Sequence, residues 1–372
     1  MRILFCEIKK ETRLKLKESL LGFSLDELKK TFSDKYGEKT YRAGQVFTAL
    51  NGGLGFSEMT NLSLSLRKAL ENDYSAVPVK IIETLKSKED GTEKFLFLLD
   101  DGNVIEGVLM RYEYGATLCV STQVGCRMNC AFCASGLEGL IRNLTSAEIL
   151  GEVVAVNKYL GGGLKDKRAV TNVVLMGSGE PLDNYDNVIR FLRLLSCADG
   201  LNISARNVSL STSGIVPKMY ELAKEGLPVN LTVSLHSPFD EERKEIMPIA
   251  KVYSIKQILD ACSAYFDATG RRYIFEYVLI AGKNDGERHS RKLIELLKGR
   301  PCHVNIIRLN EVKERTLVAA TDKAAYRFAA SLEKAGISAT VRRRMGADID
   351  GACGQLRRRY LGLDGKSEIK NG

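Results

Sequence analysis

Residues 116–133, ATLCVSTQVGCRMNCAFC, join a short apolar run to three closely spaced cysteines. A longer segment at residues 146–160 follows, with the apolar periodicity of a helix. Five further apolar runs precede helical patterns along the chain, namely VTNVVLM (170–176), NVSLST (207–212), VNLTVSL (229–235), RYIFEYVLI (272–280) and HVNIIRLN (303–310). This alternation predicts six β-α units and an α/β fold, as an open doubly wound sheet or a barrel with helices outside.

Polar and glycine-rich clusters follow most of these predicted strands. The cysteines follow the first strand, and Gly177–Pro181 follows the second. Ser211 ends the third, Ser234 and His236 end the fourth, and Asn310 ends the sixth. Because the carboxyl ends of parallel strands meet at one edge of a sheet or one mouth of a barrel, we expect these side chains to converge.

The chain divides into four segments by pattern. Residues 1–78 read as helical, which predicts a small packing domain or an RNA-docking module. Residues 79–115 hold strand-like runs separated by Asp-Gly turns, which predict a β-hairpin extension. Residues 116–345 hold the six units, and residues 346–372 form a glycine-rich loop around Cys353 and a polar tail.

Composition excludes several protein classes. With 372 residues, 44% hydrophobic and 27% charged, the chain is not disordered, collagen-like or coiled-coil. No apolar run approaches the roughly 20 residues of a membrane span, and the N-terminus returns to charge after Cys6, unlike a signal peptide. We therefore expect a cytoplasmic protein without a membrane segment. The net charge of +9 suits a polyanionic partner.

Three of the nine cysteines have a spacing typical of metal binding. An odd count in a cytosolic chain argues against structural disulfides. Cys126, Cys130 and Cys133 follow C-x3-C-x2-C, so their thiolates suit three irons of a [4Fe–4S] cluster and leave the fourth iron open. Structural zinc needs four ligands and usually a second cysteine or histidine pair, which the neighbouring sequence lacks, so zinc is the weaker alternative.

The motifs together resemble the radical S-adenosylmethionine (SAM) superfamily and, within it, the RlmN family of adenine carbon-2 methyltransferases. The segments that carry the resemblance are CVSTQVGCRMNCAFCASGLEGLIRNLTSAEILGEV (119–153), VVLMGSGEPLDNYDNV (173–188), LSTSGIVPKM (210–219), VSLHSPFDEERKEIMPI (233–249), HVNIIRLN (303–310) and MGADIDGACGQLRRRY (345–360). The resemblance runs from about residue 35 to about residue 361. It implies an incomplete (β/α)6 radical SAM barrel with a small N-terminal helical domain and a β-hairpin extension.

The resemblance also implies the cofactors and their ligands. Cys126, Cys130 and Cys133 would bind a [4Fe–4S] cluster, and each turnover would use two SAM molecules. The implied SAM contacts are Gly179, Glu180, Ser211, Ser234, Leu235, His236 and Asn310. Ser178 departs from the family, which usually has Met between the two glycines. Pro181 favours carbon 2, because Cfr-like carbon-8 methyltransferases tend to have Ala there, and they remain the alternative.

The resemblance implies a reaction through two cysteines, because carbon 2 of adenine is not a nucleophile. Cys353 would accept a methyl group from one SAM, and a radical from the second SAM would turn it into a methylene radical that adds to the base. Glu106 matches the family's proton acceptor. Cys119 would then attack the Cys353 sulfur, and a transient disulfide would release the product. Without the resemblance, Cys119 reads as a buried strand residue and Glu106 as an exposed strand carboxylate.

The implied partners are 23S rRNA, tRNA and a one-electron donor such as flavodoxin or ferredoxin, with the enzyme as a monomer. Two arginine runs, 342–344 and 357–359, flank Cys353, and we expect them to hold RNA phosphates. A solvated basic surface is the simpler interpretation of these runs. A non-catalytic RNA-binding or iron–sulfur electron-transfer protein is a further alternative, but it gives no reason for Cys119 and Cys353.

Overall fold

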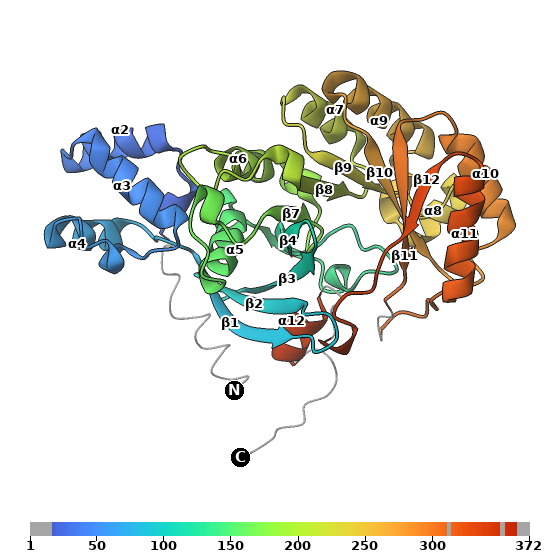
Figure 1. The fold of residues 1–372 in the computed structure, drawn as a ribbon, viewed down its shortest axis with the longest axis horizontal. Coiled ribbons are helices and arrows are strands. Elements are labelled where there is room, and N and C mark those ends of the chain that lie inside the picture. Colours follow the sequence, from blue (N-terminus) through green and yellow to red (C-terminus); the bar gives the residue numbers. More distant parts are fainter. Residues whose placement is uncertain (1–16, 311–313, 350–353, 363–372) are drawn as a thin grey trace, which may run out of the picture.

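One ten-stranded sheet forms the centre of the computed structural model, which describes residues 17–310, 314–349 and 354–362 (Figure 1). The sheet has the order β1-β2-β3-β4-β7-β8-β9-β10-β11-β12. Its strands are β1 (Val79–Lys86), β2 (Glu93–Leu99), β3 (Val104–Tyr112), β4 (Gly115–Cys119), β7 (Asn172–Leu175), β8 (Val208–Thr212), β9 (Asn230–Ser234), β10 (Tyr273–Leu279), β11 (Cys302–Arg308) and β12 (Ser338–Val341).

All neighbours from β4 to β12 pair in parallel, and helices connect them. The connecting helices are α5 (Ser146–Tyr159), α6 (Tyr185–Leu195), α7 (Val216–Lys224), α8 (Asp240–Ile246), α9 (Ile255–Thr269), α10 (Glu287–Leu297) and α11 (Asp322–Lys334). Along β8, Val208, Leu210 and Thr212 are buried, whereas Ser209 and Ser211 alternate with them on the other face. The α/β architecture with its central parallel sheet is therefore confirmed, and the six predicted strands all occur.

The parallel part of the sheet is curled. Arg342 directly follows β12, and its guanidinium reaches the Met176 sulfur, just after β7, at 3.7 Å. Four strands separate β7 from β12 in the sheet, so only a curved sheet brings these two ends together. Strand β12 is a seventh parallel strand that the sequence did not predict, because its four residues, SATV, are too few and too polar to show a strand pattern.

The predicted β-hairpin extension is larger than a hairpin and is not separate from the central sheet. Strands β1, β2 and β3 pair antiparallel in sequence order, and β3 pairs antiparallel with β4. Strand β1 also packs closely on α5, since a Cβ atom at Gly151 would lie 2.7 Å from Val79. The extension thus continues the central sheet, and both parts share one hydrophobic core.

The N-terminal helices α2 (Leu25–Tyr36), α3 (Thr40–Asn51) and α4 (Leu64–Asp73) lie beside α5 and α6 (Figure 1). Helix α2 begins with a capping box, in which Ser24 and Glu27 satisfy each other's backbone N–H groups. Leu66 and Leu70 are buried, as their four-residue spacing predicts. Arg190 of α6 forms an ion pair with Glu27 of α2 and donates a hydrogen bond to the Gly22 carbonyl at 2.8 Å. None of the described helices is long and apolar enough to cross a membrane.

Candidate active site

The three cysteines lie on a tethered loop beside the mouth of the curled sheet. The loop leaves a small hairpin of β5 (Gln123–Gly125) and β6 (Leu140–Asn143). The Cys126 N–H donates to the Gly139 carbonyl at 2.9 Å, and the Ala131 N–H donates to the Ile246 carbonyl at 2.8 Å. These backbone bonds hold the loop between the hairpin and the end of α8.

Their environment disfavours free thiolates. Burial raises the pKa of Cys126 to about 12 and raises that of Cys130 well above its usual range, and the neighbouring Cys133 adds to both shifts. The three thiols are therefore close enough to affect one another electrostatically. No three His, Cys, Asp or Glu side chains converge as a single-ion metal site within residues 17–310, 314–349 and 354–362. Thiolates at these positions need a cationic centre to offset their desolvation, because metal binding requires deprotonated cysteines.

A buried arginine adds to the fit with an anionic cofactor. The Arg243 side chain is fully buried, and its Nε and Nη2 atoms donate to the carbonyls of Leu235, Ser213 and Ser234. Its Nη1 atom has no hydrogen-bond partner among the described residues, and its charge acts on Cys130. A buried unpaired guanidinium nitrogen beside a predicted cluster ligand suits a negatively charged group bound there.

The glycine-rich loop after β7 is locked against the chain that leaves β4. A Cβ atom at Gly177 would lie 2.6 Å from the Val120 carbonyl oxygen, and one at Gly179 would lie 2.6 Å from the Gln123 side chain. Gly179 also has a φ of 108°, which L-residues rarely adopt. Both positions therefore need glycine, and the Ser178 backbone between them accepts hydrogen bonds from Thr122 and Gln123. The backbone holds this position, where the family usually has Met, so serine fits there.

Glu180 is the buried carboxylate of this loop. One oxygen accepts the Ser213 N–H at 2.7 Å and the other accepts the Leu182 N–H at 3.0 Å. Burial raises the pKa of Glu180, while these hydrogen bonds oppose the shift. The carboxylate thus joins the ends of β7 and β8, at the edge where the predicted SAM contacts stand.

His236 follows β9 in a left-handed conformation, with a φ of 59°. Its Nδ1 atom accepts the Val278 N–H at 3.0 Å, and its ring meets the edge of Phe132, with centroids 4.6 Å apart. Phe132 directly precedes Cys133, so this contact joins the cysteine loop to the end of β9. Such strained residues are common at functional sites, where packing holds them in place.

The buried ring of His236 leads to a pH prediction. Burial lowers its pKa to about 3, and the Arg243 charge acts in the same direction. We expect nitrogen-15 NMR to show the neutral Nε2–H tautomer unchanged from about pH 8 to about pH 5. The unfolded chain does bind this proton below about pH 6.5, so the free energy of unfolding falls by about 2 kcal/mol from this residue between pH 6.5 and pH 5. A ring that titrates near pH 6.5 in the native protein would contradict this placement.

Glu276 of β10 is a buried residue that the sequence analysis did not single out. It lies beside Ser211, Ser234 and Leu235. Ser211 Oγ donates to the Glu276 carboxylate at 3.3 Å, Ser234 stands opposite it in register, and the Leu235 N–H donates to its carbonyl. Burial raises the pKa of Glu276, and an ion pair with Arg342 at 3.3 Å opposes this shift. The structure thus brings the predicted SAM contacts of β8 and β9 together, whereas Asn310 is exposed, two residues beyond β11.

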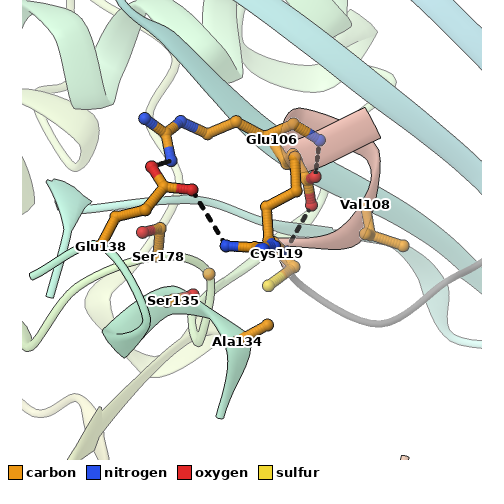
Figure 2. A pocket seen from close by; sticks show the side chains of 12 residues that line it. Glu106, Val108, Cys119, Ala134, Ser135, Glu138 and Ser178 are labelled. Carbon is orange, nitrogen blue, oxygen red and sulfur yellow. Dashed lines mark hydrogen bonds and ion pairs between the residues drawn. The ribbon is translucent and has the colours of Figure 1, made fainter. Parts of the chain in front are cut away.

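Glu106 and Cys119 line one pocket, together with Ser135 and Ser178 (Figure 2). Cys119 ends β4 and is 6% exposed, packed with Val108. Glu106 lies on β3 and is 5% exposed, contrary to the expectation of an exposed strand carboxylate. Its carboxylate forms an ion pair at 3.2 Å with Lys94, whose side chain is fully buried. The pocket therefore brings a thiol and an acid together beside the cysteine loop and the glycine-rich loop.

The same carboxylate caps the short helix α12 (Gln355–Tyr360). It accepts the backbone N–H groups of Gly354, at 2.8 Å, and Arg357. Leu356 is buried against Leu96 and Val104, which further seats the helix on the extension. Cys353, the predicted methyl acceptor, lies outside the described residues. Gly354, the next residue in the chain, lines the pocket that contains Glu106 and Cys119.

In the second arginine run, which we expected to hold RNA phosphates, carboxylates of the chain itself engage Arg357 and Arg358, whereas Arg359 is exposed. Arg357 is 8% exposed and pairs with Glu138 at 2.7 Å. Arg358 pairs with Glu138 and with Glu314, and Arg359 lies 3.5 Å from Glu83. In the first run, Arg342 pairs with a buried carboxylate, whereas residues 343 and 344 are exposed. The carboxylates that pair with these arginines are distant in the sequence, so no local pattern predicts the pairing.

Sequence reasoning missed four charged residues at this site: Lys94, Glu138, Arg243 and Glu276. Two had a usable signal, because Lys94 and Glu276 are charges within or beside apolar strand patterns, KFLFLLD and RYIFEYVLI. A charge on a buried strand needs a partner, and this requirement singles such a residue out. Arg243 and Glu138 lie in polar stretches, where nothing distinguishes them from solvated charges.

Comparisons with known proteins agree with this geometry. Residues 120–294 match the radical SAM superfamily model, and residues 18–75 match the ribosomal RNA large subunit methyltransferase N-terminal domain. A protein of Clostridium perfringens (strain 13 / Type A), named a probable dual-specificity RNA methyltransferase RlmN, is 51% identical over 347 residues, which cover 92% of this chain and 98% of that protein. A protein of the same name from Clostridioides difficile (strain 630) is also 51% identical over 347 residues, with 93% and 99% covered.

A solved structure shares nearly the whole fold. The radical SAM methyltransferase from Sphaerobacter thermophilus is 39% identical and covers 91% of this chain and 98% of its own, with a TM-score of 0.86. The matched superfamily implies a [4Fe–4S] cluster and SAM, which suit the cysteine loop and the glycine-rich loop described above. Two family models, two near-complete relatives and this shared fold lead to one conclusion: the chain belongs to the RlmN family of radical SAM methyltransferases.

Proposed function

We propose that this enzyme methylates carbon 2 of an adenine in 23S rRNA, and in tRNA, through a methylated cysteine. The observation that carries the proposal is the shared pocket of Glu106 and Cys119, which Gly354 also lines, next to Cys353 in the chain. An enzyme that only cleaved SAM would need neither a second buried thiol nor a buried acid there. The names of the near-complete relatives support RNA as the substrate.

The residues proposed for the cofactors are those that the family resemblance implies, and the cysteine loop and the ends of β7, β8 and β9 support most of them. Cys126, Cys130 and Cys133 would hold the cluster, and Arg243 would face its negative charge. Gly179, Glu180, Ser211, Ser234, Leu235, His236 and Asn310 would bind SAM, of which each turnover consumes two. When bound and reduced, the cluster supplies the electron that cleaves one SAM to a 5′-deoxyadenosyl radical.

The remaining chemistry belongs to side chains of this chain. The Cys353 thiolate attacks the methyl carbon of the first SAM, so that an S-methylcysteine forms and S-adenosylhomocysteine leaves, a nucleophilic step. Loss of one hydrogen from this S-methyl group to the radical gives a carbon radical, which bonds to adenine carbon 2. Loss of one electron, which the oxidised cluster would accept, and transfer of the carbon-2 proton to Glu106 restore the aromatic ring. Cys119 attacks the Cys353 sulfur, so that a disulfide forms, the carbon–sulfur bond to the base breaks, and a proton returns to the released carbon to complete the methyl group.

Burial of Glu106 matters for its proposed task as the proton acceptor. Its carboxylate is 5% exposed and lies between the Lys94 ammonium and the first backbone amides of α12. Water is largely excluded, so the acceptor is oriented before the proton is released. The same contacts tie Glu106 to the residue that follows Cys353.

RNA docking is proposed for the N-terminal helices, residues 1–78 of the chain. The matching domain model carries a ribosomal RNA methyltransferase description, and Lys30, Lys39 and Lys68 are exposed on these helices. We further propose that the enzyme works as a monomer in the cytoplasm, with flavodoxin or ferredoxin as the electron donor. The target adenine must leave its stack to reach the buried pocket.

The test is mass spectrometry of the tryptic peptide from Met345 to Arg357, whose only cysteine is Cys353. In protein purified without oxygen, with an intact cluster and ample SAM, we expect a methyl group on Cys353. Unmodified Cys353 under these conditions would overturn the proposal. Nucleoside analysis of the treated RNA then separates the carbon-2 product from the carbon-8 product of a Cfr-like enzyme.

A further inference from the structure

Glu138 links two segments that are far apart in the sequence. It lies on the loop that carries the three cysteines, after Cys133 and before β6. One carboxylate oxygen accepts Arg357 Nη1 at 2.7 Å, and the other accepts Arg358 Nη1 at 3.2 Å. Both arginines belong to α12, which follows Cys353 in the chain. A single carboxylate therefore joins the cysteine loop to this helix.

The link is not an ordinary surface ion pair. Arg357 is 8% exposed, and its Nε atom also donates to the Val104 carbonyl at 2.8 Å. Exposed ion pairs contribute little, but a buried arginine that loses its carboxylate partner is left with an uncompensated charge. The paired guanidinium groups of Arg357 and Arg358 also fix the direction of the helix, because Glu138 holds them through different oxygens.

A second contact seats the helix on the same loop. Gly354 precedes α12, and a Cβ atom there would lie 3.2 Å from Ala134 Cβ and 3.4 Å from the Ser135 backbone nitrogen. Gly354 has a φ of 83°, which also favours glycine. Ala134 directly follows Cys133, so the helix touches the loop at both ends of the segment 134–138.

We propose that Glu138 is a positioning residue that couples cluster binding on the loop to docking of α12. The segment 134–138 follows Cys133 directly and has only a short 3-10 turn of its own, Ala134–Gly136, so a ligand on Cys133 acts at its first residue. When all three cysteines hold the cluster, the segment keeps the Glu138 carboxylate and the surface at Ala134 and Ser135 at a fixed separation. Helix α12 docks on both. This inference rests on the proposed cluster at Cys126, Cys130 and Cys133.

Hydrogen exchange of the full-length protein measures the coupling. The amides of residues 354–360 are followed with and without reconstituted cluster, in the native sequence, in Glu138→Gln and in the matched control Glu314→Gln. The control removes the other partner of Arg358, which lies outside the cysteine loop. We expect reconstitution to slow exchange of these amides by about tenfold in the native protein and in Glu314→Gln. In Glu138→Gln this slowing is lost.

Further readouts make the result decisive. Iron content and exchange in the central sheet must match among the variants, which shows that each has folded and is loaded. By reciprocity, Glu138→Gln should hold its cluster less tightly than Glu314→Gln, so that a lower concentration of chelator removes half of its iron at equilibrium. The inference is overturned if Glu138→Gln keeps the full cluster-dependent slowing, or if loaded native protein shows none. Failure of the native protein to bind iron at all would instead count against the proposed function.

A Glu138→Asp variant tests whether Glu138→Gln acts through loss of the carboxylate or only through disruption of the loop. It keeps the charge but shortens the reach, so we expect part of the slowing to return. If aspartate restores nothing while iron content and sheet exchange are normal, the carboxylate is not the coupling group, and the inference is wrong.

Discussion

Replacement of Cys126 by alanine abolishes RNA methylation and leaves the central sheet intact. Cys126 is 8% exposed on a loop that backbone hydrogen bonds already hold, so loss of one sulfur removes little packing. It removes one of three thiolates, however, and a cluster held by two is not retained. We expect both the 5′-deoxyadenosine product and the methylated adenosine to fall below detection, with iron content reduced in parallel.

Cys197→Ala is the matched control, because Cys197 is a half-buried cysteine outside every motif. It should keep its iron and its activity. Methylation by Cys126→Ala at a measurable fraction of the native rate would show that the loop is not a cluster site. The S-methyl content of Cys353 in the same variant shows whether the first methyl transfer depends on the cluster.

Replacement of Cys119 by alanine traps the enzyme on its RNA. Cys119 lies on β4 in the pocket that Glu106 and Gly354 also line, and the proposed disulfide step requires its thiol. Without it, the carbon–sulfur bond between Cys353 and the base has no route to cleavage. We expect a covalent protein–RNA adduct as the main product, and less than about a hundredth of the native yield of free methylated RNA.

The adduct is visible as a shifted band in a denaturing gel, and mass spectrometry should place the modified nucleotide on the Met345–Arg357 peptide. Cys302→Ala provides a control, since Cys302 is also a buried cysteine on a strand of the same sheet. That variant should turn over normally. Free product from Cys119→Ala at the native rate would remove Cys119 from the reaction.

The sequence predicts the parallel strands of this fold well, because buried strands and amphipathic helices leave local periodic signals. It also predicts the convergence of Glu180, Ser211 and Ser234, since parallel strands present their carboxyl ends at one edge. Strand β12 escapes because four residues are too short for a pattern. Such elements form through pairing with β11, which is a tertiary effect.

Pairings between distant charges escape for a related reason. Arg357 and Glu138 are 219 residues apart, and Lys94 and Glu106 belong to different strands. Nothing local to the run of arginines indicates that its members lie beside carboxylates of the same chain, because a solvated surface or RNA phosphates would explain the same pattern. Charge composition predicts that partners exist, whereas only the fold decides which ones they are.

The antiparallel strands β1, β2 and β3 continue the same sheet as the parallel strands. This continuity limits how far the chain can be shortened. A chain shortened to begin at β4 would leave that strand as a bare edge, with unpaired backbone groups that invite aggregation. It would also lose Glu106 and the apolar seat that Leu96 and Val104 give to Leu356. The smallest segment that can carry out this chemistry is therefore larger than the (β/α) core. In recombination between homologues, the crossover point should lie upstream of β2.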